Sequence, residues 1–148
     1  MSIGDRISQV EAKFNAHADW EDKYRELIKV GKNLPVIDEK NQVSKYEIKG
    51  CQSKVWLKPS LVKGRAVFQA DSDAILVKGI IGLLLEVYSD STPEEIMANP
   101  PAFLTSIGIT DHLSLNRTNG LRSMVKQIQT YASLFQSLIS KGLEDADI

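Results

Sequence analysis

Cys51 is the only cysteine in the chain and the residue best suited to nucleophilic chemistry. It lies between Gly50 and Gln52 in a small, polar stretch that is typical of a turn. A thiol reacts as its thiolate, and a cysteine with an ordinary pKa of about 8.5 is only a few per cent ionised at neutral pH. Lowering that pKa by one unit requires about 1.4 kcal/mol of thiolate stabilisation, which loop amides, Lys49 or Lys54 could supply.

Other roles for this cysteine stay open. A lone cysteine is most often a small buried apolar residue, although a position in a turn favours exposure instead. Cys51 could also pair with His112 as nucleophile and base of a thiol hydrolase or transferase, because the two need only meet in space. No oxyanion or substrate motif accompanies that pair, so we consider it the weaker alternative.

Composition excludes several other classes. A single cysteine with only His17 and His112 as imidazoles rules out an internal disulfide and argues against a self-sufficient iron-sulfur cluster or a closed zinc site. The net charge of -1 gives no general field that would bind nucleic acid. No signal-peptide pattern begins the chain, and no apolar run reaches membrane-spanning length. We expect a cytoplasmic protein that binds no metal, nucleic acid or membrane.

The elements around Cys51 predict a small sheet. Apolar Tyr46 and Ile48 alternate with charged residues, and Val55 and Leu57 repeat the same two-residue period. These segments predict two strands of a hairpin with Cys51 at its turn. A third strand is expected over residues 65–70, which closes an antiparallel sheet with Cys51 at its rim.

Helices are expected on both sides of this sheet in the sequence. Apolar residues recur at three- and four-residue steps in the first third and again in the second half. The predicted boundaries are a cap at Asp19, a left-handed Gly31, a cap at Asp71 or Ser72, a capping box at Thr92 with Pro93, and a stop at Gly108. No repeat or linker divides the chain, so we expect one α+β domain over residues 1–148, with helices packed on a three-stranded antiparallel sheet.

Several segments, in order along most of the chain, resemble the SufE family of cysteine desulfuration and iron-sulfur cluster assembly sulfur-acceptor proteins. They are Gly50-Cys51-Gln52-Ser53 with Val55-Trp56-Leu57, Trp20-Glu21 with Tyr24, Leu27-Ile28, Gly31-Lys32 and Leu34-Pro35, Asp71-Ser72-Asp73-Ala74 with Val77-Lys78-Gly79, and Leu113-Ser114 with Arg117 and Asn119-Gly120-Leu121. Leu115 departs from the family pattern, because many relatives are expected to have proline there.

The resemblance implies that Cys51 takes sulfur from the persulfide of a pyridoxal-phosphate cysteine desulfurase and stimulates that enzyme. The sulfur would then pass to an iron-sulfur cluster scaffold complex. The chain would act as a carrier and activator rather than as a stand-alone enzyme, would bind no cofactor itself, and would have a fold similar to that of cluster scaffold proteins. A remaining alternative is an adaptor that activates the desulfurase without carrying sulfur, which leaves Cys51 incidental.

Four further residues are candidates for partner binding. We hypothesise that Cys51 rests against apolar neighbours and swings out on docking, with Gly50 as the hinge and Gln52 beside the thiol. Arg117 is expected near the start of the last helix, where the dipole disfavours a cation, so contact with the desulfurase or the persulfide anion competes with an ordinary surface role. Asp73 could contact the partner, although capping a helix is the simpler interpretation.

Overall fold

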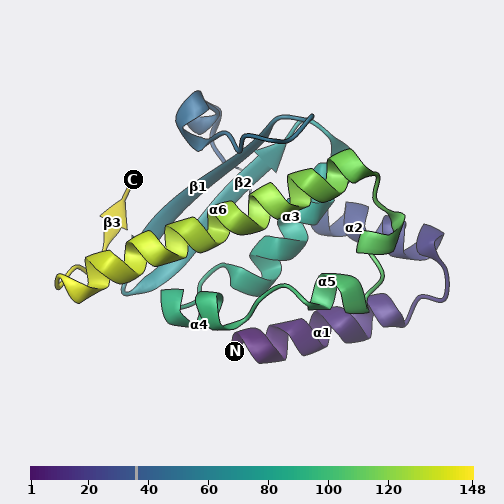
Figure 1. Ribbon diagram of the computed structural model, residues 1–148, viewed down its shortest axis with the longest axis horizontal. Coiled ribbons are helices and arrows are strands. Elements are labelled where there is room, and N and C mark those ends of the chain that lie inside the picture. Colours follow the sequence, from purple (N-terminus) through teal and green to yellow (C-terminus); the bar gives the residue numbers. More distant parts are fainter. Residues whose placement is uncertain (36) are drawn as a thin grey trace.

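The computed structural model describes residues 1–35 and 37–148. Its α+β fold, with helices packed on a three-stranded antiparallel sheet, confirms the predicted class (Figure 1). The α-helices are α1 (Ile3–Asn15), α2 (Trp20–Lys32), α3 (Ile75–Tyr88), α4 (Pro93–Ala98), α5 (Phe103–Ser106) and α6 (Leu115–Ser140). The strands are β1 (Val55–Val62), β2 (Arg65–Ser72) and β3 (Ala146–Asp147), and the short 3-10 helices are η1 (Glu39–Asn41), η2 (Ser44–Tyr46) and η3 (Thr110–His112).

The sheet is built on a hairpin of β1 and β2, which pair along their whole length. Lys63 and Gly64 connect them with φ values of 51° and 77°, the positive-φ conformation whose twist suits a two-residue hairpin turn. Alternate residues of β1 are buried, as expected for a strand with one face on the core. Strand β3 pairs with β1 at Ser60 and Leu61, so the strand order is β2-β1-β3.

The predicted hairpin around Cys51 was wrong. The segment before Cys51 forms η2 and then contributes a single bridge, between Glu47 and Trp56, rather than a strand. So short an alternating run does not fix a strand. The second predicted segment, with Val55 and Leu57, belongs to β1, which continues through Pro59 to Val62. The strand predicted over residues 65–70 is confirmed as β2, while the third strand comes from the end of the described chain.

Helix α3 forms the centre of the core, against β2 on one side and α2 on the other. The two helices approach so closely that a Cβ on Gly79 would lie 2.4 Å from the carbonyl oxygen of Leu27. A Cβ on Gly31 would lie 2.9 Å from the backbone nitrogen of Gly79. Gly31 is therefore a packing residue inside α2, which corrects its predicted role as a left-handed residue after the helix.

The starts of α2 and α4 are capped by nearby side chains. Asp19 accepts a hydrogen bond from the backbone of Asp22, and Thr92 accepts one from Glu95, as predicted for the starts of α2 and α4. Helix α3 differs, because its N-cap is Ala74, which makes no side-chain cap. The expected cap at Asp71 or Ser72 is therefore wrong, although the Ser72 hydroxyl accepts a hydrogen bond from the backbone of Ala74.

Helix α6 crosses the molecule in front of α3 (Figure 1). It is the longest helix of the described chain, with 26 residues, and begins with Ser114 as its N-cap. Its buried stripe includes Gly120, Leu121, Met124 and Ile128. No helix in residues 1–35 and 37–148 combines the length and apolar character needed to cross a membrane.

Candidate functional site

Cys51 lies in a short loop whose two ends are fixed by hydrogen bonds. At the first end, the Ile48 backbone N–H donates to the Val55 carbonyl at 2.8 Å. At the second end, both backbone groups of Lys54 are bound: its N–H donates to Asp73 Oδ1 at 3.0 Å, and its carbonyl accepts from the Ser72 hydroxyl at 2.8 Å. Residues 49–53 therefore form a loop between two anchored points.

Gly50 gives this loop a bend that a residue with a side chain would adopt only with strain. Its φ is +88°, in the region that favours glycine. A Cβ at Gly50 would also lie 2.7 Å from the hydroxyl oxygen of Ser123 on α6. The loop thus lies directly on α6, and the positive φ of Gly50 favours glycine at this position.

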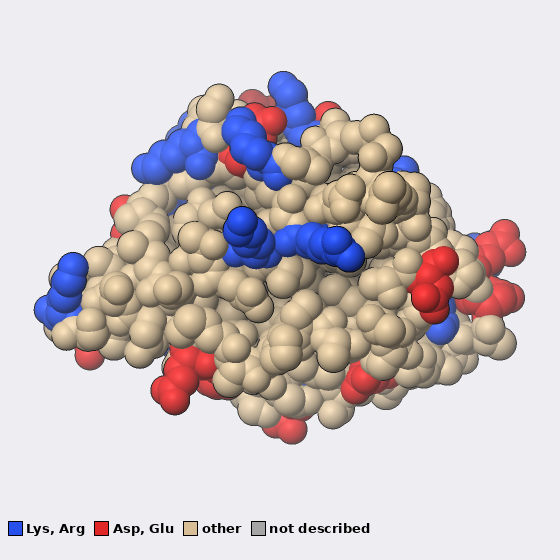
Figure 2. All heavy atoms as spheres, viewed as in Figure 1, with Lys and Arg blue, Asp and Glu red and all other residues tan. Residues whose placement is uncertain are grey.

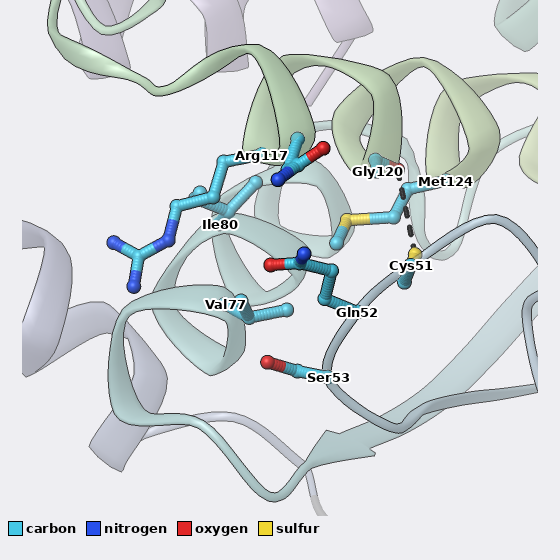
Figure 3. A pocket seen from close by; sticks show the side chains of 9 residues that line it. Cys51, Gln52, Ser53, Val77, Ile80, Arg117, Gly120 and Met124 are labelled. Carbon is cyan, nitrogen blue, oxygen red and sulfur yellow. Dashed lines mark hydrogen bonds between the residues drawn. The ribbon is translucent and has the colours of Figure 1, made fainter.

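The Cys51 side chain points toward α6 and is half-buried. Its Sγ lies 3.7 Å from the carbonyl oxygen of Gly120, to which the thiol donates a weak hydrogen bond (Figure 3). A Cβ at Gly120 would lie 3.4 Å from the same sulfur. Gly120 therefore provides both the acceptor and the room for the resting thiol.

Beside the thiol is a cavity of about 70 Å³. Its walls come from the Cys51 loop, α3 and the first half of α6, and its lining is partly apolar and partly polar. The lining residues are Cys51, Gln52, Ser53, Val77, Ile80, Asn116, Arg117, Gly120 and Met124. The cavity is small, but its volume exceeds that of a single sulfur atom, and it opens beside a nucleophile.

The surroundings of Cys51 favour its neutral form. Burial raises the pKa of the thiol above its ordinary value, because the thiolate would lose hydration. The Gly120 carbonyl acts in the same direction, since it accepts a hydrogen bond from the S–H group and would repel a thiolate. Lys49 pairs instead with Glu47 at 3.5 Å. In this conformation Cys51 is a sheltered thiol rather than an activated nucleophile.

The predicted partner-binding residues divide into two groups. Gln52 and Arg117 line the cavity, and the Gln52 amide points between Val77 and the first turns of α6 (Figure 3). Arg117 is exposed, and its guanidinium is directed away from Cys51. Gly50 and Asp73 do not line the cavity, and they instead shape and anchor the loop.

The hydrolase alternative has no geometric support. The ring of His112 stacks on that of Trp20, with centroids 4.4 Å apart and planes at 7°. Among the described residues, no histidine lines the cavity beside Cys51. Within the same part of the chain, no group of three or more histidine, cysteine, aspartate or glutamate residues could hold a metal ion.

Sequence reasoning missed part of the cavity wall. Ile80 and Met124 fit apolar helix stripes in the sequence, and their place beside the Cys51 loop carries no separate signal. Gly120, part of the resemblance to the family, packs closely against the thiol itself. The spacing of Gly120 and Met124 by four residues, which places them on one helix face, is the one available indication.

Comparisons with a family model and with curated proteins lead to the same family. The sequence model of the family described as "SufE: Fe-S metabolism associated domain" matches residues 8–132. An uncharacterised SufE-like protein of Synechocystis is 33% identical over 135 residues, which cover 91% of this chain and 85% of the relative. Two further uncharacterised SufE-like proteins, from Rhizobium meliloti and Rhizobium etli, are 36% and 38% identical and cover 85% and 86% of this chain and 94% and 90% of their own lengths.

A solved structure supports the same fold. The solution structure of a hypothetical protein from Thermus thermophilus superposes with a TM-score of 0.75. The match covers 89% of this chain and 96% of the other, at 19% sequence identity. At that identity the similarity establishes a shared fold only.

Proposed function

The chain belongs to the SufE family, whose domain is associated with Fe-S metabolism, and on that premise we propose that Cys51 is a sulfur acceptor. It takes persulfide sulfur from a pyridoxal-phosphate cysteine desulfurase, stimulates that enzyme by clearing its persulfide, and relays the sulfur to an iron-sulfur cluster scaffold complex. The proposed setting is the cytoplasm, where a reducing environment keeps a single cysteine available.

The position of Cys51 is the observation that carries this proposal. The thiol lies on a loop anchored at Ile48 and Lys54, with its sulfur against Gly120 and a small cavity beside it. A sulfur carrier needs a nucleophile that can reach a partner and a place that shields the bound sulfur from oxidation and hydrolysis. A loop that rests on a cavity meets both needs.

The transfer step balances without a further reactant. Cys51 gives up its proton to solvent, and the thiolate attacks the terminal sulfur of the donor persulfide. A sulfur-sulfur bond forms on Cys51 as the corresponding bond of the donor breaks, and the donor thiolate leaves and takes up a proton. The transferred sulfur keeps its oxidation state, so no oxidant or reductant is consumed.

This step requires the loop to leave its resting position. In the resting conformation the thiol is half-buried and its pKa is raised by burial, so the attacking thiolate is scarce. Swinging outward exposes the sulfur to water and returns its pKa toward the ordinary value. Gly50 is the proposed hinge, because glycine alone moves freely between positive and negative φ.

Exposed aliphatic side chains support a docking surface for the donor beside the cavity. Ile75 and Leu115 are 57% and 76% exposed, and they begin the two helices whose following turns line the cavity. Together with exposed Arg117 and Asp73 they give the surface an apolar centre with charged neighbours, a composition common at protein interfaces. Arg117 is the group proposed to contact the desulfurase or the persulfide anion.

Desulfurase turnover tests the carrier role against an adaptor role. With cysteine in excess, we expect the wild-type chain to increase sulfur release by the desulfurase and Cys51→Ser to give no increase. Serine keeps the size of the side chain but cannot form a persulfide. Equal stimulation by Cys51→Ser would show that the chain acts without carrying sulfur.

A further inference from the structure

The charge of helix α6 differs from that of the chain as a whole. The sequence has 18 basic and 19 acidic residues. Helix α6, with 26 residues, carries Arg117, Arg122 and Lys126 and contains no aspartate or glutamate. The helix dipole acts within the first turn, where it disfavours Arg117, and it gives no reason for the lack of acidic residues along the rest of α6.

Two of these cations border a second hollow, distinct from the cavity beside Cys51. Its volume is about 470 Å³, and it runs between α6 and the segment that contains α5 and η3. Buried Leu104 and Leu121 and half-buried Val125 give it an apolar floor, while exposed Arg122 and Lys126 stand on its α6 side. The remaining lining residues are Pro101, Thr105, Thr110, Thr118 and Gln129. We refer to this hollow as the α6 groove.

The groove has no acidic partner of its own. None of its lining residues is an aspartate or glutamate. Across residues 1–35 and 37–148, neither Arg122 nor Lys126 takes part in an ion pair. Figure 2 shows Lys and Arg side chains over the middle of α6, with Asp and Glu side chains toward the outline of this face. The cations are thus available to an external anion.

Helix α6 forms a wall of both the groove and the Cys51 cavity. Gly120 and Met124 line the cavity, and Leu121 and Val125, one position further along, line the groove. At a rise of 1.5 Å per residue, the charged stretch of α6 is about 14 Å long. A partner that buries about 800 Å² of each surface, as is usual for a specific complex, can cover both at once.

We propose that the α6 groove binds an acidic segment of the sulfur donor, with an apolar side chain of that segment on Leu121 and its carboxylates beside Arg122 and Lys126. This inference rests on the proposed function, since it names a docking site for the proposed donor. Contacts in the groove do not involve the Cys51 side chain, so they hold the donor while the thiol is still sheltered. The opened loop then meets the donor persulfide at a high local concentration.

The test compares charge reversal in the groove with a matched reversal outside it. Arg122→Glu changes the groove, whereas Lys141→Glu changes an exposed residue at the C-terminal end of the same helix. The Kd for the purified cysteine desulfurase encoded in the same genome is measured for both variants and the wild type. We expect Arg122→Glu to weaken binding about tenfold or more and Lys141→Glu to change it less than about twofold.

Salt gives an independent readout. Added salt weakens binding of the wild type more than binding of Arg122→Glu, because the variant has already lost the screened attraction. Equal Kd values for Arg122→Glu and the wild type would overturn the proposal, as would a donor that does not bind the wild type. Binding that depends on Arg122 but involves phosphatidylserine vesicles or a second copy of this chain in place of the donor would overturn it too.

Failure of the sulfur-acceptor function gives a different result. At saturating donor, the wild type and Arg122→Glu are both expected to acquire sulfur on Cys51, because the variant leaves the thiol and its cavity intact. Absence of that sulfur in the wild type, together with Arg122-dependent binding, would reject the acceptor chemistry and retain the docking site. Sulfur transfer to the wild type, together with an equal Kd for Arg122→Glu, would retain the acceptor chemistry and reject the docking site.

Discussion

The sulfur of Cys51 lies 3.7 Å from the carbonyl oxygen of Gly120, although 69 positions separate the two residues in the sequence. The thiol donates to that carbonyl and fits over a position where α6 has no side chain. This contact favours the protonated form of Cys51 and holds its loop on the helix. This conformation therefore shelters the sulfur, and we expect reactivity to require breaking this contact.

Filling the space at Gly120 should release the thiol. In Gly120→Ala the new Cβ would lie 3.4 Å from the sulfur, at the tight limit of van der Waals contact, so less room is left for the thiol. A cost of about 0.5–1 kcal/mol in the resting conformation raises the population of the released loop about two- to fivefold. We expect iodoacetamide to alkylate Cys51 faster by that factor, and Gly120→Val to show a larger increase.

Gly4→Ala is the matched control, because Gly4 also lies in a helix and its Cβ would meet only Ser2, at 3.7 Å. It should leave alkylation of Cys51 at the wild-type rate. Wild-type rates in both Gly120 variants would contradict the resting contact.

The pH dependence of alkylation should show that burial raises the pKa of the Cys51 thiol. Because burial raises the pKa of Cys51, its alkylation rate should rise with pH through a midpoint above that of a free cysteine. Gly120→Val should lower this midpoint toward the ordinary value. The raised pKa also makes stability depend on pH. The contribution of the protonated thiol to the free energy of unfolding is complete below the unfolded-state pKa, and it is lost as pH rises through the folded-state pKa. A midpoint at or below the ordinary value would contradict this description.

Replacing Gly50 should strain the loop in two separable ways. Gly50→Ala places a side chain at φ +88° and brings its Cβ within 2.7 Å of the Ser123 hydroxyl. We expect a loss of about 1–3 kcal/mol in the free energy of unfolding, measured by urea denaturation. Adding Ser123→Ala removes the close oxygen, so the double variant should recover part of the loss. Additive effects of the two changes would show that the loop does not rest on Ser123.

The anchor at Asp73 should limit motion of the Cys51 loop. Asp73→Ala removes the acceptor for the Lys54 backbone N–H, whereas Asp73→Asn keeps an oxygen at that position. We expect hydrogen exchange at Lys54 and alkylation of Cys51 to increase in Asp73→Ala and to change little in Asp73→Asn. If the two variants behave alike and both lose affinity for the desulfurase, the Asp73 carboxylate acts in the partner interface instead.

The elements that depend on local residues were predictable from the sequence. Asp19 and Thr92 start their helices as expected, because a cap involves only the next few residues. Gly31 was misassigned because its requirement comes from Gly79 on another helix. Strand β3 has two residues and owes its place to pairing with β1, so no local pattern could predict it.

The position of the proposed nucleophile was predictable, but its surroundings were not. The sequence places Cys51 in a polar loop and Arg117 near the start of the last helix, and the structure has both residues there. Their functional roles stay predictions. The Gly120 carbonyl and the Met124 side chain enter the site only when α6 packs against the loop. Contacts between segments so far apart in the sequence are set by the tertiary fold, so the spacing of residues along the chain does not predict them.

Intact-mass spectrometry shows directly whether Cys51 receives and keeps a sulfur atom. The chain is incubated with the desulfurase and cysteine, separated, and weighed before and after reduction. We predict that the wild type gains the mass of one sulfur, that reduction removes it, and that Cys51→Ser gains none. No added sulfur on the wild type, or an equal gain by Cys51→Ser, would show that Cys51 is not a sulfur acceptor.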